Sequence, residues 1–209
     1  MVKSDLALRE LVAASVKGDD NLALHLLAAS PTLARVCFQA GATRQTAKTF
    51  YLAPIGRYIW AGDTALHIAA AAYQTEMVRM LLCAGADVHA KNRLGDEALH
   101  AAAVGQPGSR MWNPPAQAAT IVCLIEAGAD PNTINKTGVS PLHRAVRSRC
   151  AKAVRTLLEC GADPALRNKS GSTPMLLATH NTGRGGTGSP EAKSQQQEIL
   201  GLLERRAQG

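Results

Sequence analysis

Three histidines recur at equivalent positions along this chain of 209 residues, and imidazoles are common metal ligands and proton-transfer groups. His67, His100 and His143 each close the pattern Gly-x-x-x-Leu-His. Adjacent units of a repeat would hold these side chains in separate layers, and no cysteine or carboxylate accompanies them at the spacing of a zinc site. We therefore predict neither a metal site nor a bound cofactor.

Catalysis would need a nucleophile, a base and a group that orients the base, and the sequence suggests no such set. The recurring carboxylates Asp87, Asp130 and Asp163 occupy loop positions and do not form an inward-facing pair. An enzyme would instead require a reactive side chain beside an aromatic insertion, such as Cys37 or His25. We expect no catalytic residues and a protein that is not an enzyme.

A glycine-rich stretch at residues 183–188 has the spacing Gly-x-Gly-x-x-Gly. A phosphate cradle of this kind needs a strand before the glycines and a helix after them. Here a predicted helix precedes the stretch, and neither Lys-Ser nor Lys-Thr follows it. We interpret it as a flexible connector to a last helix that starts near Ser189 and Pro190.

The histidines belong to a longer pattern that occurs four times. Its leading glycines are Gly62, Gly95, Gly138 and Gly171, at intervals of 33, 43 and 33 residues. An interval in this range is typical of stacked supersecondary units rather than of a single globular core. The sequence therefore predicts one elongated repeat domain.

Each copy of the pattern carries signals for two helices. Thr64, Ser140 and Thr173 can cap the start of a first helix, whereas Glu97 is a poorer cap. Apolar residues at i, i+3 and i+4 predict one buried face on this helix, and a larger apolar stripe predicts a second helix. The second helices end at glycines that open the sequence Gly-Ala-Asp, namely Gly85, Gly128 and Gly161.

With its Leu-His-x-Ala openings and its Gly-Ala-Asp closings, the chain resembles the ankyrin repeat family over residues 59–206, and in degenerate form over residues 8–30. The resemblance implies an all-α ankyrin-repeat solenoid of helix-turn-helix units with projecting hairpin loops, called fingers. It implies that the recurring histidine bonds to backbone and to the Thr or Ser three residues earlier. It also implies that the fingers and first helices line a concave surface that binds other proteins.

The expected organisation is a single domain over residues 1–209, with four repeats behind a degenerate N-terminal capping repeat. Residues 11–27 align with the first repeat at an offset of 55, and a cap of this kind keeps its outer face polar. The expected segments are a cap (5–36), an insertion (37–58), repeat 1 (59–91), repeat 2 with an inserted loop (92–134), repeat 3 (135–167), and repeat 4 with a glycine-rich loop and a C-terminal capping helix (168–206).

Three insertions interrupt the 33-residue period. The first adds 22 residues before repeat 1, and the aromatic side chains around Tyr58 and Trp60 either pack as a local core or form a binding hot spot. The second adds 10 residues at 105–115, where Trp112 either folds back on neighbouring helices or contacts a partner. The third adds 12 residues to repeat 4.

Composition limits the environment and the partners. The formal charge is +7, from 23 Lys and Arg against 16 Asp and Glu, and this favours acidic partners. Five cysteines without a CxxC pair indicate no disulfide framework, so we expect a reducing, cytoplasmic location. The sequence shows no signal-peptide core and no apolar stretch of the ~18 residues that a membrane helix needs. We expect a monomer that does not engage a membrane.

Basic residues repeat at the tips of the predicted fingers. Arg93, Lys136 and Lys169 stand two residues before a pattern glycine, so stacking would align them in a basic ladder. We expect Arg144, Arg147 and Arg149 to extend it. The ladder is either a solvated face or a recognition strip for an acidic segment of a partner protein. Nucleic-acid binding is the alternative, and the lack of interleaved aromatic residues argues against it. The predicted partner-binding residues are Tyr58, Trp60, Asp63, Arg93, Asp96, Trp112, Lys136, Arg147, Lys169 and His180.

Overall fold

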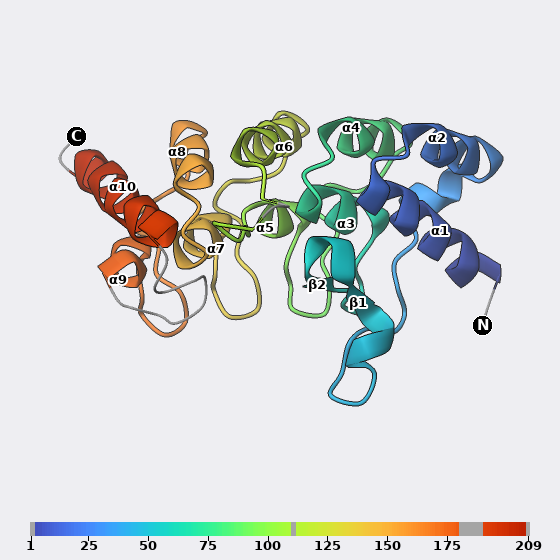
Figure 1. Ribbon diagram of the computed structural model, residues 1–209, viewed down its shortest axis with the longest axis horizontal. Coiled ribbons are helices and arrows are strands. Elements are labelled where there is room, and N and C mark those ends of the chain that lie inside the picture. The colour runs from blue at the N-terminus through green and yellow to red at the C-terminus, as the bar shows by residue number, and fades with distance from the viewer. Residues whose placement is uncertain (1–2, 110–111, 180–189, 208–209) are drawn as a thin grey trace.

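The computed structural model describes residues 3–109, 112–179 and 190–207. Its helices form an inner row and an outer row along one elongated stack (Figure 1). The inner row contains α1 (Lys3–Lys17), α3 (Ala65–Ala71), α5 (Ala98–Ala102), α7 (Pro141–Arg147) and α9 (Pro174–Thr179). The outer row contains α2 (Asp20–Ala29), α4 (Thr75–Cys83), α6 (Pro114–Glu126), α8 (Ala151–Glu159) and α10 (Pro190–Ala207). The predicted all-α stack of helix pairs is confirmed.

The core runs along the whole stack between the two rows. Each central inner helix contributes one leucine that is at most 1% exposed, namely Leu66, Leu99 and Leu142. The facing outer helices contribute leucines that are fully buried, namely Leu81, Leu124 and Leu157. Because equivalent positions repeat, each unit buries its apolar face against its neighbours rather than within itself. None of the helices in the described part of the chain combines the length and apolar character that crossing a bilayer requires.

The predicted loop at residues 105–115 is shorter than expected, because α6 already begins at Pro114. Asn113 caps this helix, with its side-chain oxygen accepting the backbone N–H of Ala116 at 3.1 Å. Proline suits the first turn of a helix, where its missing N–H has no partner to lose. The two prolines therefore end the loop instead of belonging to it.

The insertion before repeat 1 contains a small hairpin that the sequence analysis did not predict. Strands β1 (Tyr51–Leu52) and β2 (Arg57–Tyr58) pair antiparallel, with Tyr51 opposite Tyr58. Three short 3-10 helices, at Pro31–Ala34, Ala47–Phe50 and Ala53–Ile55, precede or join them. The hairpin projects below the inner row, on the same side as the loops between repeats (Figure 1). The insertion thus adds a wall beside α3.

Each recurring histidine joins its own inner helix to the next finger. The Nδ1 atom of His67 accepts the backbone N–H of Thr64 at 3.2 Å, and its Nε2 donates to the backbone oxygen of Asp96 at 3.0 Å. His100 makes the same contact with the backbone oxygen of Val139 at 2.9 Å, and His143 with that of Ser172 at 3.0 Å. One nitrogen accepts and the other donates, so each imidazole is neutral.

These imidazoles favour the neutral state because they are buried. Burial is the largest influence on each, and it lowers the pKa of His67, His100 and His143 below the ordinary value. Below pH ~6.5 the unfolded chain therefore binds protons that the folded chain excludes. By linkage, stability falls as the pH decreases through this range.

We expect the free energy of unfolding to decrease between pH 7.5 and pH 5.5, by up to about 1.4 kcal/mol for each of the three histidines. Urea denaturation followed by circular dichroism at both values measures the change. His100→Gln should lower stability at pH 7.5 and reduce the difference between the two pH values. Equal stability at pH 7.5 and pH 5.5 would contradict the role given to these imidazoles.

Candidate functional site

A cavity of about 800 Å³ opens on the inner face of the stack. The hairpin residues Tyr51 and Tyr58 line one side, and residues of α3, α5 and α7 line its base. The loop before α6 also lines the cavity, with Gly105, Gln106 and Trp112. The first two insertions therefore turn part of an open concave face into a walled cavity.

Aromatic side chains form a continuous row along the hairpin side. The rings of Tyr51 and Tyr58 lie 4.9 Å apart between centroids, and those of Tyr58 and Trp60 lie 6.0 Å apart. The guanidinium of Arg93 lies over the Trp60 ring, 4.6 Å from its centroid, in cation–π geometry. The structure thus brings together three of the predicted site residues, Tyr58, Trp60 and Arg93. Phe38 and Phe50 of the same region are buried in the core instead.

Trp112 folds back on the stack and also lines the cavity. Its indole N–H donates to Oε1 of the buried Gln117 at 3.0 Å, and the ring packs against the core. The amide of Gln117 in turn donates to the backbone oxygen of Ala102 at 2.9 Å. The two interpretations of this tryptophan are therefore compatible, because one half-buried ring faces both the core and the cavity.

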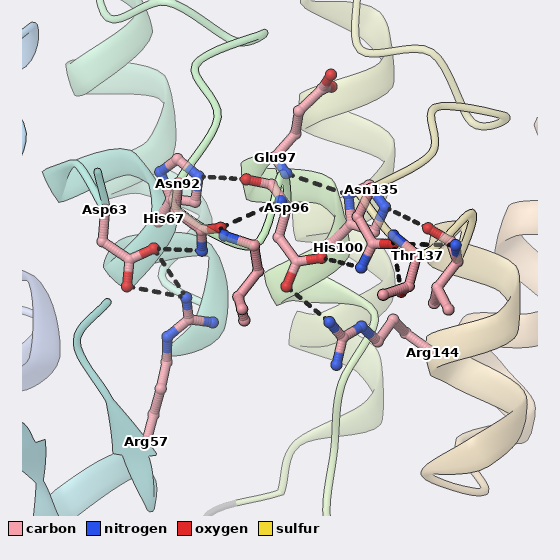
Figure 2. A network of polar contacts seen from close by, with 12 residues as sticks. Arg57, Asp63, His67, Asn92, Asp96, Glu97, His100, Asn135, Thr137 and Arg144 are labelled. Atoms are coloured by element: carbon pink, nitrogen blue, oxygen red, sulfur yellow. Dashed lines mark hydrogen bonds and ion pairs between the residues drawn. The ribbon is translucent and has the colours of Figure 1, made fainter. Parts of the chain in front are cut away.

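Asp63 is fully buried, and its carboxylate makes hydrogen bonds with neighbouring groups of the chain (Figure 2). Its carboxylate contacts Nη2 of Arg57 at 3.3 Å, and it accepts the backbone N–H of Trp60 at 2.8 Å. The side-chain amide of Asn92 donates to it at 2.9 Å. The carboxylate therefore fixes the hairpin and the next finger and presents no exposed charge to a partner.

Asp96 repeats this arrangement one unit further along (Figure 2). It is 8% exposed, and its carboxylate binds Nη2 of Arg144 at 2.7 Å and the side-chain amide of Asn135 at 2.8 Å. Burial by itself would raise the pKa of Asp96, but the Arg144 guanidinium and the Asn135 donor outweigh it and lower that pKa below its ordinary value. In the third repeat Val139 stands at this position, so the series of buried carboxylates ends there.

The finger tips carry the basic ladder in register. The backbone N–H groups of Arg93, Lys136 and Lys169 each donate to the preceding finger, at 2.7, 3.1 and 3.0 Å. The three side chains are exposed. Lys136 and Lys169 lie outside the cavity lining, whereas the half-buried Arg147 belongs to it. The predicted residue His180 and the pattern at residues 183–188 fall outside the described part of the chain.

The predicted extension of the ladder is wrong at one residue and altered at another. Arg149 is only 7% exposed, in the turn before α8, where its φ of 57° is left-handed. Arg144 is half-buried and held by Asp96 inside the cavity rather than along the finger edge. Arg144 departs from the ladder because α7 faces the cavity, and Arg149 departs from it because it lies buried in the turn between α7 and α8.

Arg57 and Tyr73 are polar cavity residues that the sequence did not indicate. Arg57 is the partner of Asp63, and Tyr73 donates its hydroxyl to the backbone oxygen of Val104. Tyr73 also has a left-handed φ of 57°, at the turn position that Gly18 occupies in α1–α2 with a φ of 68°. The offset of 55 residues aligns Tyr73 with Gly18. Because a bulky residue is disfavoured in this conformation, a tyrosine at a glycine position could have indicated an unusual turn.

The residues considered for catalysis lie elsewhere. Neither Cys37 nor His25 belongs to the cavity lining, and His25 is exposed on the outer helix α2. In residues 3–109, 112–179 and 190–207, no group of three or more His, Cys, Asp or Glu side chains is arranged to hold a metal ion.

The substitution Asp96→Asn should destabilise the fold by about 1–3 kcal/mol, because Asn135 and Arg144 donate to different carboxylate oxygens and the amide replaces one of those oxygens by a donor. Urea denaturation at pH 7 measures the loss. Asp130→Asn is the matched control, since Asp130 is exposed and its carboxylate accepts, within the described residues, only the backbone N–H of Asn132. That variant should change stability by less than about 0.5 kcal/mol. Equal effects of the two substitutions would contradict the structural role of Asp96.

Comparisons with known proteins agree with this geometry. The sequence model of the family described as "Ankyrin repeat" matches residues 61–93, and that described as "Ankyrin repeats (3 copies)" matches residues 116–186. A curated relative is "Ankyrin repeat and SOCS box protein 16" of Mus musculus, 38% identical over 89 residues. The matched region covers 42% of this chain and 19% of the relative, so the chain spans about a fifth of that protein's length.

Domains built from these repeats are generally protein–protein interaction modules and typically have no enzymatic activity. The repeated pattern, the paired helices, the histidine contacts between units and both sequence matches lead to one conclusion: the chain belongs to the ankyrin repeat family.

Proposed function

We propose that the chain is a non-enzymatic binding module that holds an acidic segment of a partner protein against its concave, basic face. The observation that carries the proposal is the adjacency of the cavity of about 800 Å³ to the stacked pair Trp60 and Arg93. Tryptophan, tyrosine and arginine are the side chains most enriched at the energetic centres of protein interfaces. Lys136 and Lys169 continue the positive edge beyond this pair.

The binding groups are held in place before any partner arrives. The backbone of Arg93 is bonded to the preceding finger at 2.7 Å, and its guanidinium lies on an indole ring. Association therefore orders few additional side chains, and less conformational entropy opposes binding. In this proposal Asp63 and Asp96 act indirectly, because they position Arg57 and Arg144 rather than touch the partner.

We also propose the division of labour along the chain. Residues 5–36 cap the stack, residues 37–58 wall the cavity, and repeats over residues 59–206 supply the concave face. The first pair of helices supports this division, because α1 packs against α3 and α2 against α4. The five cysteines carry free thiols, which supports a cytoplasmic location.

The experiment is an affinity purification with the chain as bait and two matched triple charge reversals. Replacing Arg93, Lys136 and Lys169 by Glu should reduce recovery of the protein partner tenfold or more, because it reverses the ladder. Replacing Arg79, Lys152 and Lys193 by Glu changes the net charge equally, but these side chains lie exposed on the outer helices α4, α8 and α10. This control should retain the partner.

Equal loss with both triple variants would show that net charge alone drives recovery, and equal retention would show that the ladder takes no part. Recovery of nucleic acid with a steep fall in affinity as salt rises would favour the alternative function.

A further inference from the structure

We propose that the cavity is a subsite for one carboxylate side chain, Asp or Glu, of the bound segment, flanked in that segment by an aromatic or large aliphatic side chain. This inference rests on the proposed function and names the chemistry of its partner. The subsite lies beside the finger-tip ladder and uses other arginines.

The charges around the cavity match a single negative group. Among the described residues that line it, three are arginines, namely Arg57, Arg144 and Arg147, and one is a carboxylate, Asp96. Asp63 lies buried directly behind Arg57 and offsets a second positive charge. The formal charges of these five side chains sum to about +1, which matches a carboxylate more closely than a phosphate of charge near −2.

Two of the guanidiniums are pre-oriented for this contact. Asp63 holds Arg57 through Nη2, and Asp96 holds Arg144 through Nη2, while the side chains remain 18% and 28% exposed. Within the described part of the chain, neither arginine makes a hydrogen bond through its second terminal nitrogen, Nη1. A guanidinium that is fixed on one edge can donate a charge-assisted hydrogen bond from the other with little loss of entropy.

Apolar surface adjoins these donors. Tyr51, Tyr58 and Val104 line the cavity and are 45%, 40% and 42% exposed, a high exposed fraction for large hydrophobic side chains. The half-buried rings of Trp60 and Trp112 lie on the hairpin side and the loop side. A cavity of about 800 Å³ with such a lining accommodates a few side chains of a bound segment. The segment therefore needs an anchor with a large apolar side chain beside its carboxylate.

The probe is a peptide chosen from a random dodecapeptide display library on the immobilised 209-residue chain. We expect the selected peptides to share Asp or Glu within three positions of an aromatic or large aliphatic residue. One such peptide is labelled with fluorescein and its Kd is measured by anisotropy. Its Glu→Gln form, or its Asp→Asn form, should bind at least tenfold more weakly.

The decisive variant is Asp96→Asn with Arg144→Leu, which removes the guanidinium together with its buried partner and leaves the net charge unchanged. The matched control is Glu198→Gln with Arg155→Leu, which removes an exposed ion pair of 2.8 Å between α8 and α10. The cavity variant should bind the acidic peptide at least tenfold more weakly and should distinguish it less from the amide form, because of the two pre-oriented arginines only Arg57 remains. The control should behave like the unmodified chain.

A second variant tests the apolar half without touching the buried network. Tyr58→Ser should weaken the peptide several-fold and leave the preference for the carboxylate over the amide unchanged. Unfolding midpoints of all variants show whether the fold is kept. If the cavity variant unfolds, Arg57→Lys gives the second test of the carboxylate preference, which should decrease.

The inference is overturned if the selected peptides lack an acidic residue. It is also overturned if changing the peptide's carboxylate to an amide weakens binding by the same factor in the cavity variant as in the unmodified chain. Failure of this inference can be distinguished from failure of the proposed function. Loss of the partner with Glu at positions 93, 136 and 169, but not with the cavity variant, would keep the ladder and exclude the subsite.

Discussion

The hydrogen bond from each inner-helix imidazole to the backbone of the next finger is the contact on which the rest of the structure depends. It fixes the spacing between repeats through a buried group that has both of its nitrogens occupied. Asp96 shows how far the consequence extends, because its backbone oxygen accepts from His67 while its carboxylate holds Arg144. The contact that stacks two repeats therefore also places a guanidinium in the cavity.

Buried carboxylates extend this link from the stack to the surface. Asp63 and Asp96 each connect the following finger, through an asparagine, with an arginine at the cavity. A buried ion pair adds little net stability, but it holds both partners in a defined geometry when its remaining hydrogen bonds are satisfied. The pairs are best understood as positioning devices, and their absence at Val139 confines the device to the N-terminal part of the concave face.

The cavity also carries a conformational cost. Tyr73 occupies a left-handed turn where glycine would be unstrained, and this conformation costs an ordinary residue about 1–2 kcal/mol. The ring supplies what glycine cannot, namely cavity surface and a hydroxyl bonded to the backbone oxygen of Val104 in the next unit. The same left-handed turn occurs at Arg149, which does not line the cavity, so the conformation is a feature of the helix–helix turn to which Tyr73 adds cavity surface.

The repeat period, the helix pairs, the core leucines and the basic ladder all follow from the order of the amino acids. Caps, turns and apolar spacing act within a few residues, and the stack then multiplies them. The sequence did not indicate the hairpin at Tyr51–Tyr58 or the burial of Asp63, Asp96 and Arg149. Nor did it indicate the cavity that Tyr58, Trp60 and Trp112 line together. The burial and the cavity depend on contacts between different units and appear only when the chain is folded, whereas the hairpin is a local pairing within the insertion. Arg144 and Asp96, for example, are 48 residues apart, and no local pattern records such a pair.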